Sequence, residues 1–155
     1  MVVLRRSTKN VISHKTALYK HSFSVEGKTF ENAGHVSGRV KTLLQRMKLP
    51  EEIVRRAAIV TYEAEINICS YAERGRIVLQ VTSKQITIEV IDEGQGIADI
   101  ALAMQEGYST STANIWHMGF GAGMGLSNIK RYSDIFHITS RVGKGTRLKM
   151  IIHID

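Results

Sequence analysis

Apolar and polar positions recur along this chain with two different periods, and these periods predict helices and strands. Apolar residues return every three or four positions over residues 29–48 and 51–71, which is typical of amphipathic helices. A period of two, or a short β-branched run, predicts strands at residues 21–25, 76–81, 85–91, 135–140 and 146–154. Shorter helices are expected at residues 98–105 and 124–134, and a flexible segment rich in Ser and Thr at residues 107–118.

The order of these segments limits the architecture. After a first strand the chain runs helix, helix, hairpin, helix, strand, strand. Such an order predicts an α/β (α+β) two-layer sandwich, in which helices cover one face of a mixed, mostly antiparallel sheet. The 155 residues are expected to form one domain at 21–155, preceded by a basic N-terminal extension at 1–20.

Composition narrows the class of protein. The hydrophobic share of 43% and the charged share of 23% are ordinary for a soluble globular domain. No apolar run approaches the ~20 residues that span a bilayer, and no signal-peptide pattern opens the chain. Because Cys69 is the only cysteine, an internal disulfide is excluded, and a cytoplasmic location is expected.

The net charge of +7 is concentrated at the start of the chain. Residues 1–50 hold ten Lys or Arg against two Asp or Glu, whereas residues 51–155 hold eleven against twelve. A solvated basic face explains this pattern, and so does a docking surface for an acidic protein partner. A nucleic-acid partner is disfavoured because no recognised nucleic-acid-binding motif is present.

Four glycines at residues 119–125 stand directly before the last predicted helix. Glycine tolerates positive φ and lets the backbone approach a ligand, and a helix N-terminus attracts phosphate. Taken alone, the pattern also suits a hinge or a tight helix start. The candidate phosphate-binding residues here are Gly121, Gly123 and Gly125.

Three further groups of residues suit the same kind of ligand. Glu63 and Asn67 are four residues apart on a predicted helix and share a face, which suits either a magnesium site or two ordinary surface residues. Asp92 ends an apolar strand and could accept a hydrogen bond from an exocyclic amine, although Asp-Gly turns are common there. Thr146, after a glycine turn, could reach a base directly or through water.

The order and spacing of these groups resemble the Bergerat-fold ATPases, which include gyrase, the histidine kinases and the MutL proteins. The resemblance extends from about residue 21 to the C-terminus. The segments at residues 63–81, 104–111 and 119–136 are most similar to the serine/threonine kinases of bacterial sigma-factor partner switching. The resemblance implies a kinase that uses ATP and Mg²⁺ to phosphorylate a small antagonist protein, with a sigma factor as a further partner.

The same resemblance implies a role for each matching residue. Glu63 corresponds to the general base, Asn67 to the Mg²⁺ ligand and Asp92 to the acceptor for the adenine amino group. The remaining matches are Gly94 and Gly96 beside the base, Gly121, Gly123 and Gly125 beside the phosphates, Thr146 near adenine, and Ser109 and Thr110 in the lid over the nucleotide.

Two other functions compete with this one. The lid at residues 107–118 has no Lys or Arg, so a nucleotide-gated binding regulator without phosphotransfer is the alternative. A detached histidine-kinase domain phosphorylated on His35 is disfavoured, because the dimerising helical hairpin of such kinases is absent. The role of Trp116 in the lid and the formation of a homodimer are left open by the sequence.

Overall fold

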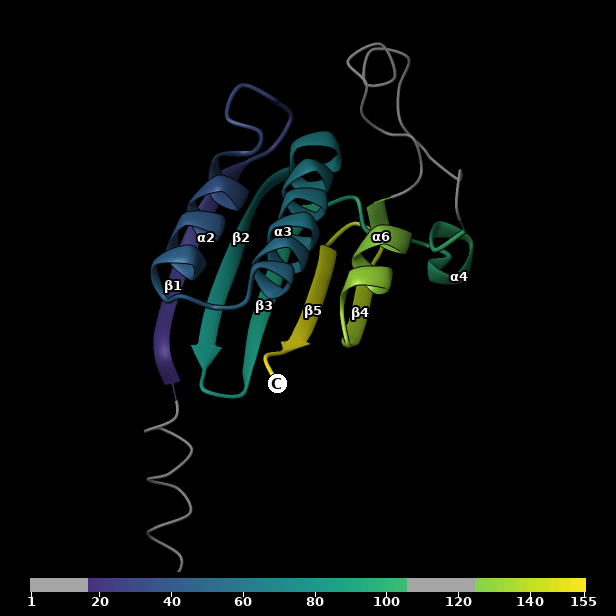
Figure 1. The fold of residues 1–155 in the computed structure, drawn as a ribbon. Helices are drawn as coiled ribbons and strands as arrows, with labels where there is room; N and C mark the ends of the chain where they lie inside the picture. Colours follow the sequence, from purple (N-terminus) through teal and green to yellow (C-terminus); the bar gives the residue numbers. More distant parts are fainter. Residues whose placement is uncertain (1–16, 106–124) are drawn as a thin grey trace, which may run out of the picture.

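The computed structural model describes residues 17–105 and 125–155, and these form a sheet with helices on one face (Figure 1). The strands are β1 (Ala17–Glu26), β2 (Ala72–Thr82), β3 (Gln85–Gly94), β4 (Ile135–Arg141) and β5 (Gly145–His153). The helices are α2 (His35–Arg46), α3 (Glu51–Tyr71), α4 (Ile100–Ala103) and α6 (Gly125–Tyr132). The predicted two-layer sandwich is confirmed.

The five strands are arranged in the order β1-β2-β3-β5-β4. Every strand pair in the described ranges is antiparallel. The sequence predicted a mixed, mostly antiparallel sheet, and these strands form no parallel pair. The last strand of the sequence, β5, lies between β3 and β4, with Ile91 opposite Arg147 at the end of the β3–β5 ladder. This insertion brings the end of β3 next to the start of β5.

The core lies between the sheet and helices α2, α3 and α6. Alternate residues of each central strand point toward the helices, which is the period-two pattern that the sequence showed. The largest fully buried apolar side chains include Leu44, Ile68, Ile77, Leu79, Ile86, Ile88, Ile129, Met150 and Ile152. In the described ranges, no helix combines the length and the apolar content needed to cross a membrane.

Helix α2 begins later than the pattern predicts, at His35 rather than near residue 29. Gly34 has φ of 90° and offers no side-chain cap, so the chain turns sharply just before the helix. The capping group comes from α3, where Glu65 is only 1% exposed. Its carboxylate accepts hydrogen bonds from the backbone N–H groups of Val36 at 3.0 Å and Ser37 at 3.2 Å.

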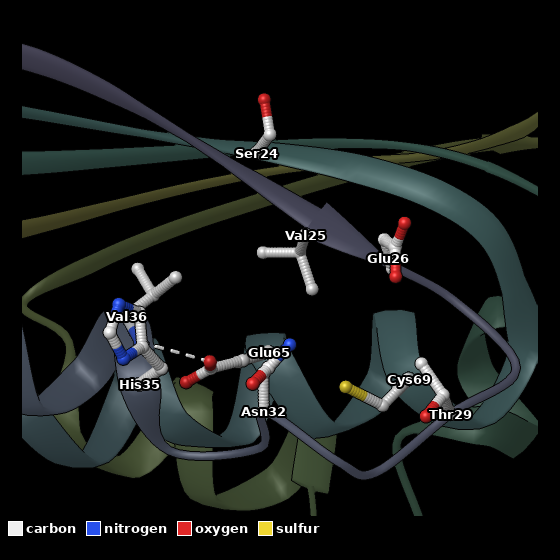
Figure 2. Close-up of a pocket in the computed structure, with 9 residues that line it drawn as sticks. All are labelled: Ser24, Val25, Glu26, Thr29, Asn32, His35, Val36, Glu65 and Cys69. Carbon is white, nitrogen blue, oxygen red and sulfur yellow. Dashed lines mark hydrogen bonds between the residues drawn. The ribbon is translucent and has the colours of Figure 1, made fainter.

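Figure 2 shows Glu65 pointing from α3 toward the first turn of α2, beside a hollow of about 230 Å³. The hollow is also lined by Val25 from β1 and by Cys69 one turn further along α3. A carboxylate at a helix N-terminus satisfies N–H groups that lack partners within the helix, and it is favoured by the helix dipole. Glu65 therefore fixes α2 against α3 in the helical layer.

The C-terminal end of α6 is held against the first half of α3. The Arg56 guanidinium donates to the carbonyl oxygen of Tyr132 at 3.0 Å and pairs with Asp134 at 3.0 Å. Asp134 also accepts from the backbone N–H of His153 at 2.7 Å. These contacts join α3, the C-terminal end of α6 and β5.

Candidate functional site

Glu63 and Asn67 lie one turn apart on α3 and both face the first residue of α6. A Cβ atom built on Gly125 would lie 3.2 Å from the Asn67 Oδ1 and 3.4 Å from the Glu63 Oε2. The shared face expected from the spacing is therefore present. The absence of a side chain at Gly125 lets the N-terminus of α6 approach this carboxylate and amide.

Glu63 is half-buried, and its environment affects its acidity. Burial raises the pKa of its carboxyl group above the usual value, and a hydrogen bond from Asn128 partly offsets this effect. The Asn128 Nδ2 atom donates to the Glu63 Oε1 atom at 3.3 Å. A raised pKa brings a carboxylate closer to the range in which it can accept a proton from a hydroxyl group at neutral pH.

Asp92 and Thr146 meet where β3 ends beside β5. The Asp92 Oδ1 atom accepts a hydrogen bond from the Thr146 backbone N–H at 3.1 Å. Burial raises the pKa of Asp92, and hydrogen bonds from the backbones of Thr146 and Gly94 lower it to a smaller extent. Gly145, with φ of 135°, permits this contact because any side chain there would overlap the backbone carbonyl of Asp92.

The loop that follows Asp92 packs against the turn between β4 and β5. The Gly143 N–H donates to the Gln95 carbonyl oxygen at 2.8 Å, and the Ile97 N–H donates to the Ser140 Oγ at 2.7 Å. Gly96 has φ of 75°, and a Cβ atom there would overlap the Arg141 carbonyl. The space at Gly96 is thus filled by the protein backbone, which gives this glycine a structural role independent of any ligand.

The group of Glu63 and Asn67 and the group of Asp92 and Thr146 both lie along the C-terminal half of α3. A Cβ atom on Gly94 would lie 2.9 Å from the Asp92 Oδ1 and 3.2 Å from the carbonyl oxygen of Tyr71. Tyr71 is four residues beyond Asn67, so the Asp92 group and the Asn67 group meet α3 at points roughly 6 Å apart along its axis, at about 1.5 Å of rise per residue. A ligand lying along α3 could contact both groups.

Some predicted site residues lie outside the described part of the chain, and two residues that contact the site were not predicted. Ser109, Thr110, Gly121 and Gly123 lie outside the described residues, so their assigned roles remain predictions. Asn128 and Ser140 were missed because their partners lie far away in the sequence, at Glu63 and at Ile97. One sequence signal was available for Asn128, since a polar residue three positions after Gly125 lies on the same face of the helix.

Comparisons with known proteins are consistent with this geometry. Residues 28–152 match the family described as the histidine kinase-like ATPase domain. The chain is 36% identical to the serine/threonine-protein kinase RsbT of Bacillus subtilis over 104 residues, which cover 63% of this chain and 72% of RsbT. It is 36% identical to the anti-sigma F factor of a Thermoanaerobacter species over 103 residues, covering 66% of this chain. The anti-sigma F factor of Caldanaerobacter subterraneus is 35% identical over a similar length. The matched region spans 64% of each of these two anti-sigma factors, just under two thirds of their length.

Proposed function

The chain belongs to the histidine kinase-like ATPase family, and we propose that it is an ATP-dependent serine/threonine protein kinase acting in the cytoplasm. Its substrate is a serine or threonine hydroxyl group of a small regulatory antagonist protein, and a sigma factor or another regulator is a further partner. The names of its relatives, a serine/threonine kinase and anti-sigma factors, support this proposal.

One observation carries the proposal: the half-buried carboxylate of Glu63 faces the N-terminus of α6 beside Asn67. In the transfer step, the substrate oxygen forms a bond to the γ-phosphorus while the bond from that phosphorus to the β–γ bridging oxygen breaks, and ADP leaves. Glu63 accepts the proton of the attacking hydroxyl group. Its raised pKa suits this role, because the carboxylate is a stronger base than an exposed one.

The residues around Asp92 suit the adenine end of ATP. An ionised carboxylate can accept about four hydrogen bonds, so the backbone N–H groups of Thr146 and Gly94 leave capacity for the exocyclic amine. The partly desolvated position of Asp92 strengthens such a bond. Asp92 thereby orients the base while the phosphates extend along α3 toward Asn67.

Asn67 would hold a magnesium ion in the proposed enzyme. Its Oδ1 atom is an oxygen ligand that faces the start of α6, and Mg²⁺ commonly takes one or two protein ligands together with phosphates and waters. Among the described residues, no group of three or more His, Cys, Asp or Glu could hold a metal ion, which is consistent with a site completed by the nucleotide. The bound ion would neutralise negative charge on the phosphates.

Replacement of the base tests the proposal. Glu63→Gln keeps the shape of the side chain and removes the proton acceptor, so phosphotransfer is expected to fall by roughly 10²–10⁴-fold while ATP still binds. The assay follows γ-³²P transfer from ATP to a small antagonist protein that binds this chain, with ATP affinity measured separately by calorimetry. Glu52→Gln is the matched control, because Glu52 is an exposed glutamate on the same helix.

The same assay distinguishes the alternative function. A nucleotide-gated regulator would bind ATP and the antagonist without forming phosphoserine or phosphothreonine. The absence of Lys and Arg from residues 107–118 favours this alternative, because phosphotransfer enzymes use cations to stabilise the transferred group. Full activity of the Glu63→Gln enzyme would instead show that Glu63 is not the base.

A further inference from the structure

Ser140, on the inner face of β4, connects the loop after Asp92 to Thr146. Its Oγ atom accepts from the Ile97 N–H at 2.7 Å and donates to the Gly145 carbonyl oxygen at 3.1 Å. It also lies 2.8 Å from the Thr146 Oγ1 atom, directly across the β4–β5 pair.

The number of protons on Ser140 determines the direction of the third hydrogen bond. A serine hydroxyl has one proton and two lone pairs. The proton is directed to Gly145, since a carbonyl oxygen can only accept, and one lone pair is occupied by Ile97, since an N–H can only donate. All three contacts are satisfied only if Thr146 donates its own proton to the remaining lone pair of Ser140.

This direction decides what Thr146 can offer to a nucleotide. With its proton used inside the protein, the Thr146 hydroxyl presents only lone pairs toward a bound base. The neighbouring Asp92 carboxylate is also an acceptor. The side chains of Thr146 and Asp92 therefore offer only hydrogen-bond acceptors to the base. Such an environment suits an exocyclic amine and disfavours a carbonyl oxygen at the same position of the ring.

We propose that Ser140 is a positioning residue that makes the site select adenine over guanine by fixing the direction of the Thr146 hydroxyl group. Adenine carries an amino group at position 6, whereas guanine carries a carbonyl oxygen there. The inference rests on the proposed binding of ATP and adds a determinant of base specificity. Ser140 acts through Thr146 and does not itself need to touch the nucleotide.

A purely structural role for Ser140 predicts a different result. If Ser140 only held the loop at residues 94–97 against the β4–β5 turn, its loss would weaken binding of every nucleotide to the same extent. If it also fixes the Thr146 hydroxyl, its loss lets that hydroxyl rotate and donate to the guanine carbonyl. The ratio of the Kd for GTP to the Kd for ATP separates these two roles.

The experiment measures both dissociation constants by calorimetry for four proteins: wild type, Ser140→Ala, Thr146→Val and the double variant. Ser140→Ala is expected to lower the GTP-to-ATP ratio by about tenfold, the size of effect expected when a polar mismatch is relieved. In the Thr146→Val background, the same Ser140→Ala change is expected to leave the ratio unaltered. Thr139→Ala is the matched control, because Thr139 is an exposed hydroxyl residue adjacent to Ser140 in β4.

Three outcomes are informative. A ratio that falls only when Thr146 is present supports the inference. Equal weakening of ATP and GTP by Ser140→Ala overturns it while leaving the proposed function intact, and wild-type protein that binds neither nucleotide overturns both. If Ser140→Ala is too unstable to assay, Ser140→Cys tests the same point, since its thiol keeps similar bulk but is a weak donor and acceptor.

Discussion

Removal of the Glu65 carboxylate is expected to destabilise the whole helical layer. Glu65→Ala removes the carboxylate that accepts two hydrogen bonds, one from the backbone N–H of Val36 and one from that of Ser37. Val36 is 4% exposed and Ser37 is 8% exposed, so water can replace the lost acceptor only poorly. Each charge-assisted bond contributes about 1.5–3 kcal/mol, and an expected loss of about 3–6 kcal/mol follows for the pair.

A loss of this size is a large part of the total, because a domain of this kind is usually stable by only about 5–15 kcal/mol. Glu65→Gln is expected to have a smaller effect than Glu65→Ala, since the amide keeps one acceptor oxygen. Its NH₂ group, however, cannot accept a hydrogen bond from a backbone N–H. The order of stability should therefore be wild type, then Glu65→Gln, then Glu65→Ala.

Urea denaturation gives the free energy of unfolding, and Cys69 reports where the structure opens. Cys69 is the only cysteine of the chain and is 4% exposed. Burial, with a contribution from the charge of Glu65, raises the pKa of its thiol to about 11. A thiol reagent should therefore modify wild-type Cys69 only through opening of the structure, and it should modify Glu65→Ala much faster.

The control for this prediction is Glu52→Ala on the same helix. Glu52 forms an exposed pair with Arg55, and such pairs contribute little to stability because water and salt screen the two charges. If Glu65→Ala and Glu52→Ala lowered the unfolding free energy equally, the view that Glu65 caps α2 would be refuted. An unchanged rate of Cys69 modification in Glu65→Ala would likewise contradict a local opening beside α2.

Three further predictions concern the site and its supports. Adenosine affinity should fall as the pH drops through the raised pKa of Asp92, because the protonated acid loses acceptor capacity, and Asp92→Asn should remove this pH dependence in calorimetric titrations. Gly145→Ala should lower the free energy of unfolding by about 3 kcal/mol or more in urea denaturation, since φ is 135° and the new Cβ would overlap the Asp92 carbonyl. The control Gly38→Ala, at an exposed position of α2 with open space around it, should be neutral or stabilising. Arg56→Ala should lower the unfolding free energy by about 1–3 kcal/mol. Burial raises the pKa of Asp134, but the hydrogen bonds from the His153 N–H and from Arg56 outweigh this effect, so the pKa is lowered overall. The stability that these bonds supply is therefore present above the usual carboxyl pKa and should be lost as the pH falls through the lowered value.

The sequence predicted the elements better than their ends. The period of apolar residues located α3 at residues 51–71 and placed the central strands, because burial on one face determines that period. The start of α2 was predicted too early. It depends on the positive φ of Gly34 and on a capping carboxylate from Glu65, almost thirty residues later in the sequence.

The site was predictable only in part for a related physical reason. Glu63 and Asn67 share a helix, so their spacing placed them on one face. The hydrogen bond between Asp92 and Thr146 joins residues 54 positions apart, and it was not predicted, since the family resemblance implied only that each residue lies near adenine. Ser140 and Asn128 make side-chain contacts that depend on sheet register and helix packing, which no local spacing encodes.

The position of β5 in the sheet has a consequence for synthesis of the protein. A chain emerging from the ribosome presents α3, β2 and β3 before β4 and β5, yet β5 must pair directly with β3. Until β5 has emerged, β3 remains an unpaired edge and Asp92 lacks the Thr146 backbone that holds its carboxylate. The proposed adenine end of the site is therefore completed last, and nucleotide would bind, and stabilise, only chains whose synthesis has passed β5.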